Sequence, residues 1–339
     1  MNISKKLLSM MRKGIDLLGS EYSIICGAMT WISDEHLVSA VSNSGAFGVL
    51  AGGSMDPEQL KQHIIATKNL TNKNFGVNLI LVHPQLHELI EVCGEQHVSH
   101  IVYAGGVPTL DIIKKAHDYN MKCLAFAPTL AIAKRMFKQG VDGIIIEGHE
   151  SGGHVGPVST LVLVQEILLQ LPDKPIFVAG GIVRGEVMAS LLAMGAAGCQ
   201  MGSIFACCKE STAHSNFKKA FLAANSRNAV VSVQLDRNFP VTAVRALENQ
   251  AYRDFMQKQK EALLKFESGE LSLEEAKLSL EHFWAGALKR AAVNGDLDTG
   301  SIMAGQSVGL ISEELSINDI LQKMFSEADN YLDTICNMN

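Results

Sequence analysis

The chain has 339 residues, of which 47% are apolar, 6% are aromatic and 19% are charged, with a formal net charge of −6. This apolar content excludes a disordered chain, and the length allows either two domains or one large α/β barrel with an addition. A net negative charge argues against a general polyanion binder, because affinity for nucleic acids depends on lysine and arginine neutralising phosphates.

The cysteines and the N-terminal segment indicate the compartment. The seven cysteines include no C-x-x-C spacing, so they suggest neither a zinc site nor a disulfide framework. Segment 1–19 carries basic residues around apolar runs too short for a signal-peptide core, and no apolar run long enough to span a membrane follows. We therefore expect a cytoplasmic protein, with segment 1–19 forming an amphipathic helix on the outside of the domain.

Between residues 23 and 203, short β-branched or apolar runs alternate with segments of helical periodicity, the pattern of βα units in a parallel sheet. Helices are expected at 57–69, 84–94, 108–119, 130–139, 160–171 and 184–194, with Pro57, Pro84 and Pro108 at helix starts. Eight consecutive βα units favour an α/β fold of the TIM (β/α)8 barrel type over an open doubly wound sheet. The eight candidate strands begin near Ile24, Ala46, Phe75, His100, Lys122, Asp142, Pro175 and Gly198.

After residue 217 the pattern changes to long helical stretches, at about 247–266 and 273–293, and a last helix is predicted at 319–333. Ser272 and Glu275 form an S-x-x-E capping box at the start of the second stretch. We predict a smaller helical cap domain of residues 217–300, packed over a barrel that is built from residues 1–216 and 301–339 with its terminal helices.

Small residues follow the last two predicted strands, at the end where a TIM barrel carries its active site. Gly180 and Gly181 come after the seventh strand, and Gly202 and Ser203 come after the eighth. Backbone N–H groups in such turns bind phosphate, and glycine lets the anion approach the backbone closely. Two such turns in consecutive units favour a phosphate site over ordinary tight βα turns.

The loop after the sixth strand, 147–157, carries two histidines, two carboxylates and four glycines. Such a loop can wrap around a planar ligand, and an imidazole exchanges protons near neutral pH. A metal site at His149 and His154 is the competing idea, but this spacing is a poor ligand pattern and no third ligand is evident. We predict no metal, and we interpret His149 alone as a solvated loop residue.

Strands one and three add two candidate contacts. Gly27, Ala28 and Met29 form the turn after the first strand, and Asn78 lies in the third. The thioether of Met29 could pack on a ring system, although a lone methionine is more often a core residue. The amide of Asn78 offers a donor and an acceptor to a heterocycle.

Together these residues resemble the flavin-dependent barrel family that holds the FMN-dependent enoyl-acyl-carrier-protein reductases and the nitronate monooxygenases (2-nitropropane dioxygenase-like proteins). The motifs are GAM at 27–29, LVSAVSNSGAFG at 37–48, FGVN at 75–78, ESGGHVG at 150–156, AGGI at 179–182 and QMGSIF at 200–205. Three further stretches, at 209–217, 243–250 and 295–310, look more like the reductase branch.

The resemblance implies one FMN per barrel, with its phosphate on the two glycine turns and its ring near Met29, Asn78 and the loop after the sixth strand. It makes His154 the predicted catalytic residue beside the flavin. Cys26 and Ala28 stand where reductases of this type often have Gln and Gly. The residues expected to bind the cofactor are Gly27, Ala28, Met29, Asn78, Glu147, Ser151, Gly152, Gly153, Gly180, Gly181, Gln200, Met201, Gly202 and Ser203.

The activity implied by the resemblance is that of an enoyl-acyl-carrier-protein reductase of fatty acid biosynthesis, in which NADH or NADPH reduces FMN and hydride then reaches a trans-2-enoyl thioester. The alternative is a nitronate monooxygenase, which oxidises alkyl nitronates with FMN and O₂. An IMP-dehydrogenase-like enzyme would need a nucleophilic cysteine; the loop after the sixth strand has none, and Cys26 lacks an evident activating partner. A non-catalytic flavin-binding protein is disfavoured by the intact glycine turns and His154.

The charge is unevenly distributed along the chain. Residues 209–260 hold nine basic and four acidic residues, a net charge of +5, so the rest carries −11. A basic segment would steer an acidic acyl carrier protein, or the phosphates of CoA, to the site; the alternative is a solvated helix surface. We predict a docking face that includes Lys218 and Lys219, no nucleic-acid or membrane partner, and a homodimer.

Overall fold

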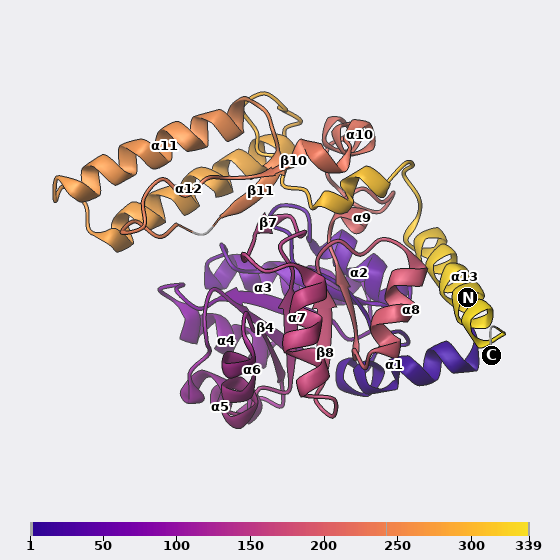
Figure 1. Ribbon diagram of the computed structural model, residues 1–339. Helices are drawn as coiled ribbons and strands as arrows, with labels where there is room; N and C mark the ends of the chain where they lie inside the picture. Colours follow the sequence, from indigo (N-terminus) through magenta and orange to yellow (C-terminus); the bar gives the residue numbers. More distant parts are fainter. Residues whose placement is uncertain (1–2, 242, 338–339) are drawn as a thin grey trace.

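The computed structural model describes residues 3–241 and 243–337, and its centre is a closed barrel of parallel strands (Figure 1). The eight strands lie in the order β1-β2-β3-β4-β5-β6-β8-β9, and β9 closes on β1 with Ile25 opposite Gln200. Each begins within one residue of its predicted start, so the predicted TIM barrel is confirmed. The strands are β1 (Ile24–Cys26), β2 (Phe47–Ala51), β3 (Gly76–Ile80), β4 (His100–Ala104), β5 (Lys122–Phe126), β6 (Gly143–Glu147), β8 (Ile176–Ala179) and β9 (Gly198–Met201).

The barrel strands are connected by helices that cover the outside of the sheet. Pro57 occupies the first turn of its helix, behind a capping box of Asp56 and Gln59. Pro84 and Pro108 each lie one residue before an N-cap residue, so these two helices begin two residues later than predicted. The helices are α2 (Glu35–Asn43), α3 (Pro57–Leu70), α4 (Leu86–Glu95), α5 (Leu110–Asp118), α6 (Leu130–Lys138), α7 (Thr160–Glu166) with the short η1 (Leu168–Gln170), and α8 (Gly185–Ala193).

A packed apolar cluster fills the barrel and seals its N-terminal end. Phe47 and Phe177 contribute large side chains from the strands, and Leu17 and Leu18 enter from α1 (Lys5–Leu18). His100 at the start of β4 forms a hydrogen bond through Nε2 with the Leu17 carbonyl (3.0 Å). The N-terminal segment is thus helical as predicted, but its end plugs the barrel rather than only covering it. The opposite, C-terminal end is the one left for a site.

A helical hairpin lies over that C-terminal end (Figure 1, orange), formed by α11 (Gln250–Glu267) and α12 (Leu273–Ala292). It has an aromatic core, in which the rings of Phe255 and Trp284 lie 4.1 Å apart between centroids. The predicted capping box of Ser272 and Glu275 is present. Below the hairpin lies an antiparallel sheet that was not predicted, β10 (Ala229–Val231), β11 (Val244–Leu247) and β7 (Gly153–His154).

The remaining elements return the chain to the barrel. They are α9 (Ser203–Ala206), α10 (Ser215–Ala223), η2 (Ser226–Asn228), η3 (Gln306–Leu310) and α13 (Ile317–Cys336), which packs against α8. The eighth strand ends at Met201, and α9 begins two residues later, so Gly202 and Ser203 follow the strand as predicted. No helix among the described residues is long and apolar enough to cross a membrane.

Candidate active site

The residues predicted to bind a cofactor lie on or directly after β1, β3, β6, β8 and β9. The strands are parallel, so these residues, from Gly27 to Ser203, gather at the C-terminal end of the barrel. The backbone N–H of Gly27 donates to the carbonyl of Met201 (3.0 Å), which joins the turn after β1 to β9. A Cβ on Gly27 would lie 3.1 Å from the buried side chain of Gln200, so glycine permits this close packing.

Gly180 and Gly181, which follow β8, both have left-handed backbone, with φ of 99° and 74°. A Cβ on Gly180 would come within 3.1 Å of the backbone N and O of Gly148, and one on Gly181 within 3.2 Å of Glu150. The turn therefore packs directly against the loop after β6, and only glycine suits both its conformation and its surroundings.

Several polar groups at this end have capacity for a ligand. The hydroxyl of Ser151 is buried beside the carboxyl group of Glu147, on whose pKa it acts. The amide nitrogen of Asn78 donates to the carbonyl of Val102 (2.9 Å), which leaves its oxygen as an acceptor. Ser203 accepts a hydrogen bond from the backbone N–H of Gly305 (3.1 Å) but keeps its own hydroxyl hydrogen to donate.

His154 lies on β7, in the part of the β6 loop that pairs with the cap. Its backbone is opposite Val244 of β11, and its Nε2 lies 3.1 Å from Oε1 of Glu281 on α12. The two side chains are 48% and 50% exposed. Burial opposes the imidazolium, but the hydrogen bond to Glu281 and the charges of Glu281 and Glu147 raise the pKa of His154 above its ordinary value. The protonated share of this ring near neutral pH is therefore larger than that of a free histidine.

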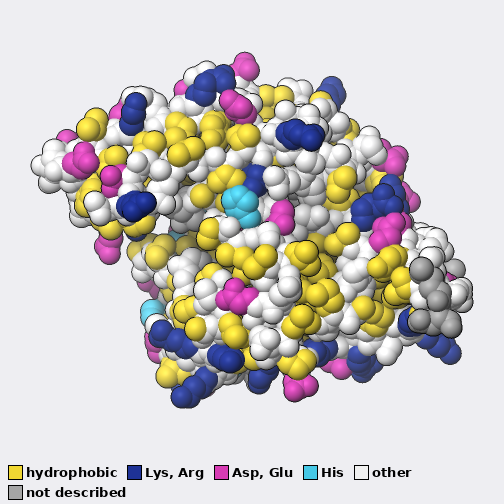
Figure 2. Space-filling view, in the orientation of Figure 1, with side chains coloured by type: hydrophobic (Ala, Val, Ile, Leu, Met, Phe, Trp, Pro, Cys, Tyr) yellow, Lys and Arg dark blue, Asp and Glu magenta, His cyan; other side chains and the backbone are white. Residues whose placement is uncertain are grey.

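Glu147 ends β6 below this histidine, and burial raises its pKa to about 7, against smaller opposing effects of Ser151 and His154. A carboxyl group that titrates near neutrality beside a histidine is typical of a functional site. In Figure 2 a histidine, a basic side chain and an acidic side chain lie together on the surface where the cap meets the barrel.

Glu147 should make the stability of the cofactor-free protein depend on pH. In the unfolded chain this carboxyl ionises near its ordinary pKa of 4.5, whereas in the folded protein it keeps its proton up to about pH 7. The folded state therefore binds more protons between these values, and the free energy of unfolding falls as pH rises, by about 3 kcal/mol over the whole window.

Urea unfolding of the wild type and of Glu147→Gln at pH 5 and pH 7.5 measures this effect. Between pH 5 and pH 7.5, the free energy of unfolding of Glu147→Gln should rise by about 2–3 kcal/mol relative to that of the wild type. Glu95→Gln, which changes an exposed carboxylate of α4, is the control and should track the wild type. If the free energies of unfolding of the wild type and Glu147→Gln differ by the same amount at pH 5 and at pH 7.5, the raised pKa of Glu147 is contradicted.

The rest of the β6 loop is fixed by hydrogen bonds of His149, Glu150 and Arg245. Nδ1 of His149 forms a hydrogen bond with the carbonyl of Gly156 (2.8 Å), and the residue is only partly exposed. The interpretation of His149 as a solvated loop residue therefore holds in part, because the ring is partly exposed while one of its nitrogens is bonded within the loop. Arg245 of β11, 2% exposed, donates to the carbonyls of His149 (2.9 Å) and Ala229 (2.6 Å). Glu150 accepts from the backbone N–H and the hydroxyl of Thr160, both at 2.9 Å.

The prediction that Lys218 belongs to the docking face is wrong. The side chain of Lys218 is 8% exposed, and its ammonium contacts Glu314 (2.8 Å) and donates to the carbonyl of Cys208 (2.7 Å). A buried cation requires such partners, so Lys218 does not face an approaching protein. Arg245 is buried as well, whereas Lys219 is exposed. The positive charge on the surface of this segment is thus smaller than the sequence count.

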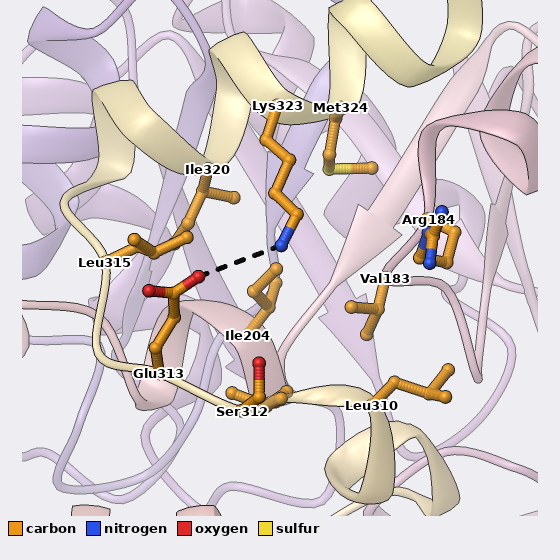
Figure 3. A pocket seen from close by; sticks show the side chains of 11 residues that line it. Val183, Arg184, Ile204, Leu310, Ser312, Glu313, Leu315, Ile320, Lys323 and Met324 are labelled. Atoms are coloured by element: carbon orange, nitrogen blue, oxygen red, sulfur yellow. Dashed lines mark ion pairs between the residues drawn. The ribbon is translucent and has the colours of Figure 1, made fainter.

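A cavity of about 160 Å³ lies beside the residues that follow the two glycine turns (Figure 3). Val183 and Ile204 line it two residues after Gly181 and one after Ser203, and α13 and segment 310–315 form its other walls. Lys323 and Glu313 form an ion pair across it (3.9 Å). The C-terminal segment of the chain therefore packs against the residues that follow both turns.

Comparisons with known proteins agree with this geometry. The sequence profile of the nitronate monooxygenase family matches residues 12–97 and 85–327. The structure of FabK from Thermotoga maritima matches with a TM-score of 0.83 at 32% sequence identity, covering 96% of this chain and 98% of that chain. Nitroalkane oxidase from Streptomyces ansochromogenes shares the fold, with a TM-score of 0.74 at 24% identity, covering 95% of this chain and 99% of that chain.

Two curated relatives are also similar. One is the (3aS,4S,5R,7aS)-5-hydroxy-7a-methyl-1-oxo-octahydro-1H-indene-4-carboxyl-CoA dehydrogenase of Rhodococcus jostii strain RHA1, 27% identical over 94% of this chain and 96% of that protein. The other is a probable nitronate monooxygenase of Staphylococcus aureus strain MSSA476, 28% identical over 64% of this chain and 73% of that protein. Fold, site and relatives together define a flavin-dependent oxidoreductase. The chain belongs to the nitronate monooxygenase family.

Proposed function

We propose that the chain binds FMN at the C-terminal end of its barrel and uses NADH or NADPH to reduce the 2,3 double bond of enoyl thioesters. The observation that carries the proposal is His154, an imidazole of raised pKa held where the cap meets the barrel. Support for the reductase comes from the similarity to FabK over nearly the whole length of both chains. Support for a thioester substrate comes from the Rhodococcus relative, whose name specifies a carboxyl-CoA.

The residues at this end of the barrel fit FMN. The turns of Gly180/Gly181 and Gly202/Ser203 would hold the phosphate through backbone N–H groups. The buried hydroxyl of Ser151 and the amides of Asn78 and Gln200 would face the polar edge of the ring, with Met29 packing beside it. Hydride transfer is the chemistry that bound FMN supplies.

The protein's own contribution is to place charge and a proton. Reduction of a double bond conjugated to a thioester puts negative charge on the thioester oxygen and then requires a proton at the α-carbon. The protonated ring of His154 can donate a hydrogen bond to that oxygen or a proton to that carbon. The backbone N–H groups of Gly152 and Gly153 are further candidate donors to the oxygen.

Nitronate oxidation is the second candidate, favoured by the family profile and by the Staphylococcus relative. The two are distinguished by mixing the FMN-loaded protein with NADH or NADPH in the absence of oxygen and then adding crotonyl-CoA. The reductase predicts rapid loss of the visible flavin absorbance and its return with crotonyl-CoA, but no return with the saturated butyryl-CoA. Slow bleaching together with O₂ consumption on alkyl nitronate would identify the monooxygenase and overturn the first proposal.

The acyl carrier protein as natural partner, the role in fatty acid biosynthesis, the cytoplasmic location and the homodimer stay predictions. So does the division into a barrel of 1–216 and 301–339 and a cap of 217–300. Exposed Lys219 is the residue of the predicted docking face at which charge reversal should raise the KM for acyl carrier protein but not for CoA thioesters. Light scattering of the purified protein measures the oligomeric state.

A further inference from the structure

The cap contributes a charged side chain to the candidate active site that neither the motifs nor the glycine turns include. Glu281 lies in the middle of α12, 127 residues from His154 in the sequence, and its Oε1 is 3.1 Å from Nε2 of that histidine. Hydrogen bonds between β7 and β11 already fix the backbone of His154. The ring is therefore held from two sides, by the sheet through its backbone and by α12 through Nε2.

The contact determines which ring nitrogen is available. A carboxylate only accepts hydrogen bonds, so Nε2 must carry the hydrogen that Glu281 receives. Nδ1 of His154 has no hydrogen-bond partner among the described residues. Nδ1 is then the nitrogen that meets a ligand, as a donor when the ring is charged and as an acceptor when it is neutral.

The charges around the ring favour its protonated form. Glu281 of α12 and Glu147 of β6 are the carboxyl groups whose charge raises the pKa of His154. Glu281 is ionised at neutral pH, whereas Glu147, with a pKa of about 7, is only partly ionised there. The effect is mutual, because the hydrogen bond and charge of His154 outweigh burial and lower the pKa of Glu281. His282, the neighbour of Glu281 on α12, lowers that pKa further. Glu281 thus stays ionised while the imidazolium holds its proton.

A second contact fixes the position of α12 over the barrel. The indole N–H of Trp31, in the β1–α2 loop, donates to the carbonyl of Ala285 (3.0 Å), and Lys289 lies 4.8 Å from the centre of the indole ring. Glu281, Ala285 and Lys289 are spaced four residues apart and so share one face of the helix. Trp31 has φ of 66°, a left-handed conformation that a bulky residue keeps only when its surroundings hold it.

We propose that Glu281 is a positioning residue for His154: it orients the ring so that Nδ1 faces the substrate and keeps the imidazolium populated at neutral pH. Because Glu281 belongs to the cap, His154 has this state only while α12 is docked on the barrel through Trp31. The role given to Glu281 rests on the proposed function only in that His154 acts in catalysis; the tautomer and the ionisation of the ring can be measured without it.

Two substitutions separate orientation from charge. Glu281→Gln keeps an oxygen that accepts from Nε2 but removes the negative charge, whereas Glu281→Ala removes both. Glu274→Gln changes an exposed glutamate in the first turn of the same helix and is the matched control. The first measurement is a histidine-selective NMR titration of the full-length protein, with the His154 signals assigned from their absence in His154→Ala.

In the wild type and in Glu274→Gln we expect neutral His154 to carry its hydrogen on Nε2. In Glu281→Gln the acid dissociation constant of the imidazolium should rise about three- to tenfold with the same tautomer, and in Glu281→Ala the tautomers should mix. In the FMN-loaded enzyme, the pH at which kcat/KM falls should be lower for Glu281→Gln than for the wild type. For Glu281→Ala kcat should drop about tenfold or more with little change in KM.

An unchanged ionisation and tautomer of His154 in both Glu281 variants would overturn the positioning role. If these variants also keep wild-type kcat while His154→Ala loses it, the proposed function stands and only the role of Glu281 fails. If the NMR result is as expected but His154→Ala keeps full reductase activity, Glu281 positions a residue that the reaction does not need. The catalytic assignment of His154 then fails instead.

Discussion

Replacing His154 with glutamine is expected to lower kcat for enoyl thioester reduction by about 10²- to 10⁴-fold, the contribution typical of a positioned general acid. Glutamine is similar in size and can still donate a hydrogen bond to Glu281, so the contact between β7 and α12 should survive. It has no proton to transfer near neutral pH. FMN affinity should change little, because the turns proposed to bind its phosphate lie after β8 and β9, not on β7.

The pH dependence of the wild type should point to the same residue. In the proposed mechanism the acid form of His154 is the active one, so the rate should be full at low pH and fall as pH rises through its pKa, which lies above the ordinary value. This fall in rate at high pH should be absent in His154→Gln. The control is His149→Gln: His149 lies in the same loop but its ring bonds to the carbonyl of Gly156, so kcat should change only severalfold. Equal losses in both variants would show that loop integrity, not acid chemistry, was lost.

The barrel could be predicted from the sequence because each of its parts is local. A run such as IVYA at 101–104 is short, apolar and followed by a helical period, and eight such units leave few alternatives. Parallel strands also place all their C-terminal ends at one edge, so the gathering of Gly27, Glu147, Gly180 and Gly202 at one end required no knowledge of side-chain contacts.

The cap sheet and the partner of His154 could not be predicted in this way. β7 has two residues and β11 has four, which is too short for an alternating pattern to stand out. The pair of His154 and Glu281 joins positions 127 residues apart. Along α12, Glu281 looks like any other charged residue on the polar side of a helix whose apolar side holds Leu280 and Trp284.

Lys218 shows the limit of counting charges. The count assumes that every lysine is exposed, yet α10 is short and buries Phe217 and Phe221, so the lysine between them is drawn into the same interface. Its partners, Glu314 and the carbonyl of Cys208, lie before α13 and after α9. Such a buried pair depends on the tertiary fold, and no local pattern reports it.

Replacing Gly180 with alanine is expected to raise the dissociation constant for FMN about 100-fold. A residue with a Cβ is strained at φ of 99°, and this Cβ would lie 3.1 Å from the backbone of Gly148. The turn would have to change its conformation to relieve this contact, and the N–H groups proposed to bind the phosphate would move with it. A loss of about 3 kcal/mol in binding corresponds to the stated ratio. Fluorescence titration of the cofactor-free protein with FMN measures it.

Two matched variants separate the phosphate site from general strain. Gly195 has nearly the same φ, 102°, but lies between α8 and β9 at the other end of the barrel, with nothing within 4 Å of its Cβ position. Gly195→Ala should lower the melting temperature and leave the affinity for FMN unchanged. Gly202→Ala should leave the melting temperature unchanged, because its Cβ would meet only the sulfur of Met29 at an ordinary 3.5 Å. It should lower the affinity for FMN, because the Cβ would narrow the space for the phosphate. If Gly180→Ala binds FMN as tightly as Gly195→Ala does, the turn after β8 is not part of the cofactor site.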